Sequence, residues 1–415
     1  MTVIEASEWL EERQAAGISY SLERIEAVLD RLDRPDNKLS VIHIAGTNGK
    51  GTVGQYLSNV LISNGLSVGS FETPSFGEVW EQLQYNGTGI DSSQFAEALS
   101  SIASEIEEVE HVRNELVSPF EVMTALAYYM FAHVLPTDAV IVEAGMGGRL
   151  DATNAVKNPA ATVITSVDLD HETYLGPTLA DIAFEKAGII KHSAPVFTGA
   201  SEPALRIIVN RAVELGTNVV DLQTFPPCSW TTDLFAPVDR LNASIAAETA
   251  VYMLQKLNVK VPDEQVIKTT ISQTKLAGRM EKIAEQPKII VDTAHNPAAV
   301  KVLIEKIGQD CTISKVQVLF AAMKDKKYLE MLDILAEANV VKKVYWCRFN
   351  DVRAAVPTLK EANSIGVTIR NEDCQEIITN LLTDSGSDEV FVITGSHAFV
   401  KLMRNHVTCQ YNKKE

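Results

Sequence analysis

The sequence predicts an α/β fold in two domains, each built on a parallel sheet. The chain has 415 residues, which is too long for one ordinary hydrophobic core. Short β-branched runs end abruptly in glycine, aspartate or histidine and are followed by helical periodicity, which is typical of parallel strands joined by crossover helices. After a helical stretch between about Thr231 and Lys260, this strand–helix alternation starts afresh from Lys288.

The first expected strand, 41–44, is followed by a glycine-rich loop and then by a helix. Apolar residues from Val53 to Leu61 recur on one face of this helix, and Asn64-Gly65 is expected to end it. Further buried strands, all of them parallel, are expected at 139–142, 163–167, 289–291, 316–320, 344–346 and 390–393.

The connecting regions complete the expected organisation. A helical arm from Glu5 to Leu32 precedes the first strand, and Asn86-Gly87 predicts a hairpin turn. A hinge is expected at 277–287, where a glycine and a proline bracket a charged stretch. The two domains are therefore expected to cover residues 1–280 and 281–415.

Composition and charge exclude several classes of partner. The chain is 46% hydrophobic and 22% charged, with a net charge of −17, so it should be repelled by nucleic acid and by anionic membranes. Neither a signal peptide nor an apolar stretch of about 18 residues is found, and a cytoplasmic location is expected. The cysteines are odd in number and form no C-x-x-C pair, which favours reduced thiols. They are Cys228, Cys311, Cys347, Cys374 and Cys409.

The glycine-rich loop has the features of a phosphate-binding site. It consists of Gly46, Thr47, Asn48, Gly49, Lys50, Gly51 and Thr52. Successive backbone N–H groups can turn toward one oxyanion, the helix N-terminus adds a positive field, and the lysine offers a mobile charge. The strict G-x-x-x-x-G-K-[ST] pattern fails, because Ile44 takes the first glycine position and Gly51 separates Lys50 from Thr52. A tight turn without a ligand is the alternative, but the strand–loop–helix order favours a nucleotide.

Polar residues follow two other expected strands. Glu143 comes after one strand and Asp170-His171 after another, so both should reach the crevice beside the loop. Mg²⁺ prefers oxygen ligands and usually takes few of them from the protein, so such a set could hold it. The alternatives are a helix-capping role for Glu143 and a hydrogen-bonded structural role for His171.

Further segments along the chain carry a resemblance to a known family. They are 142–154, 168–171, 185–191, 278–281, 292–297 and 394–396. Together with 44–52 they resemble the folylpolyglutamate synthase and dihydrofolate synthase branch of the Mur ligase superfamily, over nearly the full length. The resemblance implies an N-terminal P-loop-type ATPase domain and a smaller, Rossmann-like C-terminal glutamate ligase domain.

The resemblance implies an ATP-dependent ligase. It would add L-glutamate to the γ-carboxyl of tetrahydrofolate, to dihydropteroate, or to both, through an acyl phosphate, and it would act as a monomer. The implied metal ligands, for two Mg²⁺ ions, are Thr52, Thr73, Glu143 and His171; a monovalent cation is also allowed. Lys186 matches a lysine that can be carbamylated in this family, which requires a lowered pKa; a solvated helix charge is the alternative reading.

Residues of both domains receive roles from the same resemblance. The implied catalytic residues are Lys50, Lys186, Arg279 and His295. Arg279 would reach the γ-phosphate on domain closure, although a surface linker arginine is the alternative. Asp292 and His295 would contact the nucleotide across the interdomain cleft, and Asn242 would lie near the adenine and phosphates. Closure would exclude water from the acyl phosphate.

Two departures from the family pattern leave other functions open. Glu72 stands where relatives often carry threonine, and Gln82 stands where they commonly carry arginine. A nucleotide-binding paralogue without ligase turnover is therefore one alternative. A peptidoglycan-type acceptor is another, although only about 40 residues precede Val41, too few for an additional nucleotide-sugar domain.

Overall fold

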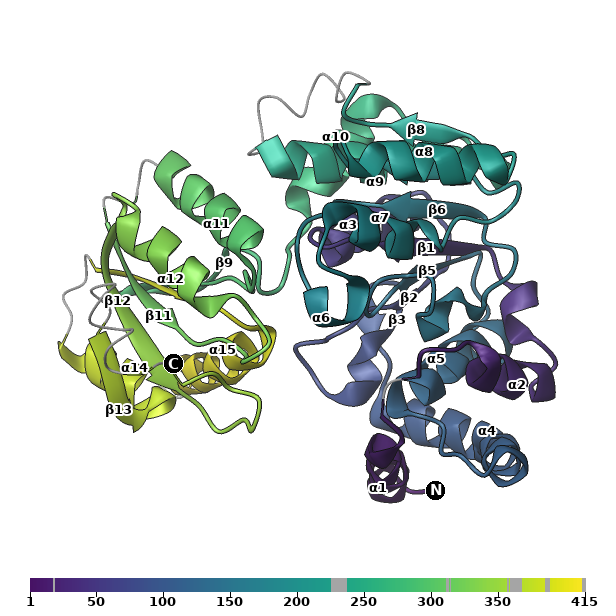
Figure 1. The fold of residues 1–415 in the computed structure, drawn as a ribbon, viewed down its shortest axis with the longest axis horizontal. Helices are drawn as coiled ribbons and strands as arrows, with labels where there is room; N and C mark the ends of the chain where they lie inside the picture. The colour runs from purple at the N-terminus through teal and green to yellow at the C-terminus, as the bar shows by residue number, and fades with distance from the viewer. Residues whose placement is uncertain are drawn as a thin grey trace. The chain divides into compact units, whose positions relative to one another are not determined.

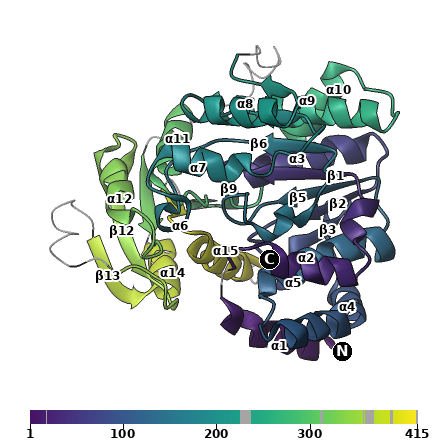
Figure 2. The same cartoon turned by 45° about the vertical axis from the view of Figure 1, so that its right-hand side comes forward.

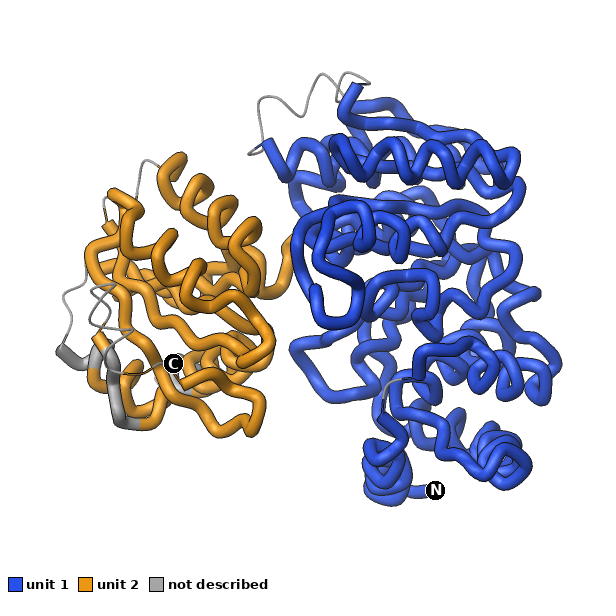
Figure 3. The backbone as a smooth tube through the Cα atoms, viewed as in Figure 1, with its two compact units in different colours: residues 1–274 blue, residues 275–415 orange. Residues whose placement is uncertain are grey.

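The computed structural model describes residues 1–17, 19–224, 237–310, 313, 315–356, 358, 368–384 and 389–412. The chain forms two compact units, Met1–Thr274 and Lys275–Glu415 (Figure 3). Each unit contains a mostly parallel sheet with helices, which confirms the predicted fold class.

The sheet of the first unit has eight strands within the described residues, in the order β4-β3-β2-β5-β1-β6-β7-β8 (Figures 1 and 2). Neighbours from β2 to β8 pair in parallel, whereas β3 and β4 form an antiparallel hairpin. Asn86 and Gly87 join these two strands with φ of 51° and 74°, so the predicted turn is confirmed. The strands are β1 (Val41–Ala45), β2 (Val68–Phe71), β3 (Leu83–Tyr85), β4 (Thr88–Gly89), β5 (Ala139–Glu143), β6 (Ala161–Ile164), β7 (Val196–Thr198) and β8 (Val219–Asp221).

Helices cover both faces of this sheet. The α-helices are α1 (Val3–Glu12), α2 (Glu23–Arg31), α3 (Lys50–Ser63), α4 (Ser92–Arg113), α5 (Pro119–Tyr129), α6 (Glu172–Leu175), α7 (Leu179–Ala187), α8 (Ala204–Glu214), α9 (Pro237–Lys256) and α10 (Glu264–Gln273). The short helical turns are η1 (Arg13–Ala16), η2 (Pro35–Lys38), η3 (Val79–Gln82), η4 (Met130–Val134) and η5 (Ala152–Ala155). Gly54 of α3 faces Ile44 and Ile141, and α3 packs along α9. Val140 and Val142 alternate to the other face and join the core with α2, α4 and α5.

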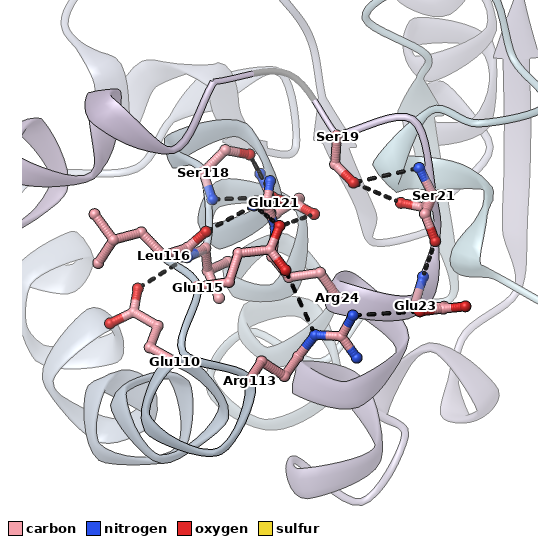
Figure 4. Close-up of polar contacts among 11 residues, drawn as sticks. Ser19, Ser21, Glu23, Arg24, Glu110, Arg113, Glu115, Leu116, Ser118 and Glu121 are labelled. Atoms are coloured by element: carbon pink, nitrogen blue, oxygen red, sulfur yellow. Dashed lines mark hydrogen bonds and ion pairs between the residues drawn. The ribbon is translucent and has the colours of Figure 1, made fainter.

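The N-terminal arm forms two helices, α1 and α2, rather than one continuous arm, and a buried ion pair fixes it to the rest of the unit (Figure 4). Arg24 is 2% exposed and Glu121 is 3% exposed. The Nε of Arg24 donates to both carboxylate oxygens of Glu121, at 2.9 and 2.8 Å, and its Nη1 donates to Glu115 and to the Leu116 carbonyl. The arm is therefore part of the core of the first unit.

The second unit has six strands within the described residues, in the order β13-β12-β11-β14-β10-β9. They are β9 (Glu281–Glu285), β10 (Lys288–Val291), β11 (Val316–Phe320), β12 (Val341–Arg348), β13 (Thr368–Asp373) and β14 (Val390–Thr394). The helices are α11 (Pro297–Gln309), α12 (Tyr328–Glu337), α14 (Cys374–Asp384) and α15 (His397–Asn412). All strand pairs are parallel except β9 with β10. The core includes Val318, Val392 and Trp346.

Two expectations about the elements are wrong. The region expected as a hinge, 277–287, contains strand β9, which pairs with β10 while the Glu281 carboxylate accepts from Gly278 N and Arg404. The strand expected at 163–167 spans Ala161–Ile164 instead; beyond it, the hydroxyls of Thr165 and Ser166 donate to the Asn48 carbonyl.

Other sequence expectations concern the thiols and the apolar stretches. Cys347 and Cys374 are buried, Cys409 is exposed, and these three form no disulfide within the described part of the chain. Cys228 and Cys311 lie outside the described residues, as does the beginning, 231–236, of the expected helical stretch. Among the described helices, none has the length and apolar character needed to cross a membrane.

Candidate active site

The glycine-rich loop takes a backbone conformation that requires glycine at two positions. Gly46 has φ of 157° and Gly49 has φ of 89° as the residue that caps α3. A Cβ on Gly46 would lie 1.9 Å from Thr165 Oγ1, and a Cβ on Gly49 would lie 2.6 Å from Asn242 Oδ1. The loop is thus packed closely against the end of β6 and against Asn242 of α9, as a cradle of backbone N–H groups requires.

The segment after β6 holds the loop in place. Thr47 N donates to the Ser166 carbonyl at 2.9 Å, and Asp168 N donates to Thr47 Oγ1 at 3.0 Å. His171 follows on the same segment at the start of α6, with φ of 52° and its Nε2 4.0 Å from an Asp170 carboxylate oxygen. The stretch that carries Asp170 and His171 is therefore anchored to the loop through Asp168.

Lys50, the first residue of α3, lies beside Glu143, the last residue of β5. Strand β5 pairs with β1 so that Glu143 is in register with Ile44. The Nζ of Lys50 lies 3.6 Å from Glu143 Oε1 and donates to the Gly46 carbonyl at 3.2 Å. Both side chains are largely buried, with exposures of 17% and 10%. A lysine and a carboxylate thus meet at the anion cradle.

Glu72 and Thr73 extend this group from the end of β2. Phe71 is in register with Val142, which places Glu72, the residue after β2, next to Glu143, the last residue of β5. Glu72 Oε2 accepts from Gln55 Nε2 at 3.3 Å. Burial and the nearby Glu143 raise the pKa of Glu72 to about 7.

The oxygen atoms of this group fit a hard divalent cation. Glu72 as a whole is only partly buried, but its Oε1 and Thr73 Oγ1 are out of reach of solvent, and neither has a hydrogen-bond partner within the described part of the chain. Two carboxylates and a hydroxyl suit Mg²⁺, which takes few protein ligands and completes its shell with phosphate and water. The described residues contain no ready cluster of three or more His, Cys, Asp or Glu side chains, so nucleotide and water would have to supply the remaining ligands.

Lys186 is buried close to the loop. It lies on α7 and is 3% exposed, so the reading of a solvated helix charge is wrong. Burial and the nearby charge of Lys50 lower the pKa of Lys186 to about 7, although Asp170 and Asp168 oppose this shift. A substantial fraction of this amine is therefore neutral near pH 7.

In the second unit, several of the predicted residues form part of a tight polar turn. Asp292 accepts from Ala294 N and from Met280 N, each at 2.9 Å, and so fixes the turn that carries Arg279. The Nδ1 of His295 donates to the Thr293 carbonyl at 2.8 Å in the tautomer that this contact requires. Burial, together with the nearby Arg279 and His295, lowers the pKa of His397 to about 4. These basic groups therefore lie near one another at the start of α15.

The sequence interpretation did not assign some residues that the structure places at the loop. Thr165 and Ser166 hold the loop but belong to no motif, and Asp168 lies in the segment 168–171 without an assigned role. Glu72 was noted only as a departure from a family pattern. A charged residue directly after the apolar run Val68–Phe71 is the same signal that identified Glu143, so Glu72 could have been found in this way.

Comparison with known proteins gives a consistent set of relatives. The family model described as Mur ligase, glutamate ligase domain, matches residues 278–397. A dihydrofolate synthase/folylpolyglutamate synthase of Bacillus subtilis is 30% identical to the chain, over 97% of this chain and 98% of that protein. A folylpolyglutamate synthase of Lacticaseibacillus casei is also 30% identical, over 90% of this chain and 91% of its own length.

Solved structures share the fold. The Mycobacterium tuberculosis folylpolyglutamate synthase complexed with ADP superposes with a TM-score of 0.85 at 24% identity, covering 98% of each chain. Escherichia coli FolC in complex with DHPP and ADP has a TM-score of 0.84 at 25% identity and covers 99% of each chain. The same architecture thus extends over nearly all of both chains.

Proposed function

Because this chain belongs to the folylpolyglutamate synthase and dihydrofolate synthase family, we propose that it is an ATP-dependent ligase that joins L-glutamate to dihydropteroate, to the γ-carboxyl of tetrahydrofolate, or to both. The observation that carries the proposal is the placement of Lys50 beside Glu143 at a glycine cradle that opens a helix. The ADP and DHPP held by related structures support ATP and a pterin substrate as ligands. A paralogue without turnover is less favoured, because curated relatives that match almost the whole chain are named as synthases.

The chemistry follows from what an amide bond requires. A carboxylate and an amine do not condense unaided in water, so an oxygen of the acceptor carboxylate first takes the γ-phosphoryl group of ATP, giving an acyl phosphate and ADP. The amine of glutamate then attacks the acyl carbon, phosphate leaves with the C–O bond electrons, and the amine loses a proton. Catalysis of such transfers consists mainly of positioning and charge stabilisation.

The loop residues would carry most of the first step. The loop 46–52 would bind the phosphates through backbone N–H groups other than those of Thr47 and Asn48, which donate to Ser166. Lys50 would neutralise charge as the phosphoryl group moves. Asn242, packed against Gly49, would border the nucleotide. Arg279, Asp292 and His295 of the second unit would complete the site, with Arg279 as the second cation at the transferring group.

The metal and the lysine modification belong to the same proposal. Thr52, Thr73, Glu143 and His171 would hold two Mg²⁺ ions, which supply charge neutralisation at the phosphates. The amine of Lys186, with its pKa near 7, would attack CO₂ through its neutral form and lose a proton to become a carbamate. A monovalent cation, a monomeric state, a cytoplasmic location and functional domains at 1–280 and 281–415 remain predictions of this proposal.

ADP release tests the function directly. It should be measured with dihydropteroate, with tetrahydrofolate and with neither, each in the presence and absence of L-glutamate. Release that depends on both an acceptor and glutamate is expected, and the preferred acceptor separates the two synthase activities. Equal release without any acceptor would leave only an ATPase.

The metal assignment has its own test. Glu143→Gln should shift the Mg²⁺ titration of turnover to higher concentration, because a carboxylate ligand becomes a neutral amide. An unchanged titration would remove Glu143 from the metal site.

A further inference from the structure

The carboxylate of Glu72 has an incomplete set of partners. Its Oε2 accepts from two side-chain amides, Gln55 Nε2 at 3.3 Å and Gln84 Nε2 at 3.5 Å. Its Oε1 is shielded from solvent and has no partner among the described residues, and the same is true of Thr73 Oγ1. Leaving a buried polar atom without a partner costs about 1–3 kcal/mol, and more for a charged group, so these oxygens are suited to bind a ligand.

The neighbouring charges indicate which kind of ligand these oxygens would bind. Glu72 lies beside Glu143. Lys50 lies 3.6 Å from Glu143 Oε1, but it also donates to the Gly46 carbonyl. The amides of Gln55 and Gln84 carry no charge, so they offset the negative charge of Glu72 only weakly. An oxygen-only donor set of two carboxylates and one hydroxyl matches a hard divalent cation rather than a metal that prefers nitrogen or sulfur.

We propose that Glu72 is an additional cation-binding residue, whose Oε1 contacts the divalent cation assigned above to Thr73 and Glu143. This inference rests on the proposed metal site and adds a second carboxylate to it. The site then carries enough negative charge to bind a divalent cation before the nucleotide arrives, whereas a site with one carboxylate depends more on the phosphates. Glu72 positions the ion, and the two glutamines orient Glu72.

Burial, together with the nearby Glu143, raises the pKa of Glu72 to about 7. The competing interpretation is structural: a protonated Glu72 that only bonds the two amides. That interpretation predicts no effect of Glu72 on cation affinity.

Binding of Mn²⁺ to the nucleotide-free protein separates the two interpretations. Mn²⁺ serves as the probe, and electron paramagnetic resonance of the unbound ion measures affinity at pH 8. Glu72→Gln keeps the shape and the contacts to Gln55 and Gln84 but removes the charge, so roughly tenfold or greater weakening is expected. Glu97→Gln, on an exposed position of α4, is the matched control and should bind as the unmodified protein does.

Two further variants, Glu72→Thr and Glu143→Gln, distinguish a cation-binding role of Glu72 from a structural one. Glu72→Thr, a second variant of different size, should weaken binding as Glu72→Gln does, with thermal unfolding in EDTA showing that both remain folded. If Glu143→Gln weakens Mn²⁺ binding but both Glu72 variants match the unmodified protein, Glu72 is structural and the inference is wrong. If the unmodified protein binds no Mn²⁺ without nucleotide, early cation binding and with it the role of Glu72 are refuted, while acceptor-dependent ADP release would still support the ligase.

Discussion

The Nζ of Lys50 lies 3.6 Å from Glu143 Oε1, although the two residues come from different strand–helix units of the chain. The register of β1 with β5 brings them together, because Glu143 ends β5 beside Ile44 of β1, and Lys50 begins α3 after the loop that follows β1. The ion pair and the Gly46 carbonyl hold the lysine over its own loop. A bound phosphate would therefore find the cation already in place.

Lys50→Ala should abolish most turnover while the protein remains folded. The lysine contributes charge to the phosphate site and little to the core, so a loss of about 100-fold or more in kcat is expected. Steady-state ADP release measures the effect, and circular dichroism checks the fold. Lys260→Ala, at an exposed position, is the control with normal activity. An unfolded Lys50→Ala protein would contradict the placement.

Gly49→Ala and Gly65→Ala form a matched pair. Their φ values, 89° and 85°, are nearly equal, so both variants should lose about 1–2 kcal/mol of stability from backbone strain. Only at Gly49 would the new Cβ collide with Asn242; nothing lies within 4 Å at Gly65. Nucleotide titration calorimetry should therefore show weakened ADP binding for Gly49→Ala alone. Equal ADP affinity in both variants would mean that the contact with Asn242 does not shape the site.

Arg24→Met should destabilise the first unit by about 3–5 kcal/mol, because it leaves Glu121 as an unpaired buried carboxylate. The double variant Arg24→Met, Glu121→Met removes both charges and should recover much of that loss. Urea denaturation of the unmodified protein, both single variants and the double variant gives the coupling energy. Additive losses would show that the pair is not coupled.

The stability of the ligand-free protein should rise with pH between about 7 and 10.5 because of Lys186. Its folded pKa is about 7 and its unfolded value 10.5, so in this window the unfolded chain carries a proton that the folded protein lacks. This group alone contributes a slope of up to about 1.4 kcal/mol per pH unit. Thermal unfolding in CO₂-depleted buffer should show the slope reduced in Lys186→Met. The same slope in both proteins would contradict a lowered pKa.

The sequence was sufficient where local signals decide the structure. The β1–loop–α3 unit follows from an apolar run, three glycines and the Asn64-Gly65 stop, and the structure has α3 end at Ser63 with Asn64 as its cap. The hairpin turn at Asn86-Gly87 was likewise found, because only a few residue pairs suit two successive positive φ angles.

Features that depend on distant partners were not found. The sequence of β9 is rich in charged residues and therefore predicts a hinge rather than a strand. Its strand conformation depends on pairing with β10. The environment of Glu72 depends on the register of β2 with β5 and on an amide from α3, neither of which appears in the local sequence. The burial of Lys186 on α7 could not be predicted either, because it depends on packing against distant parts of the chain.

The two outermost strands of the larger sheet are β4, with only Thr88 and Gly89, and β8, with only Val219 to Asp221. Such short edge strands expose few backbone amides and carbonyls with which a strand of another molecule could pair. The buried strands β1 and β5 are enclosed between neighbours. Within the described residues, the larger sheet therefore offers little edge for pairing with another chain.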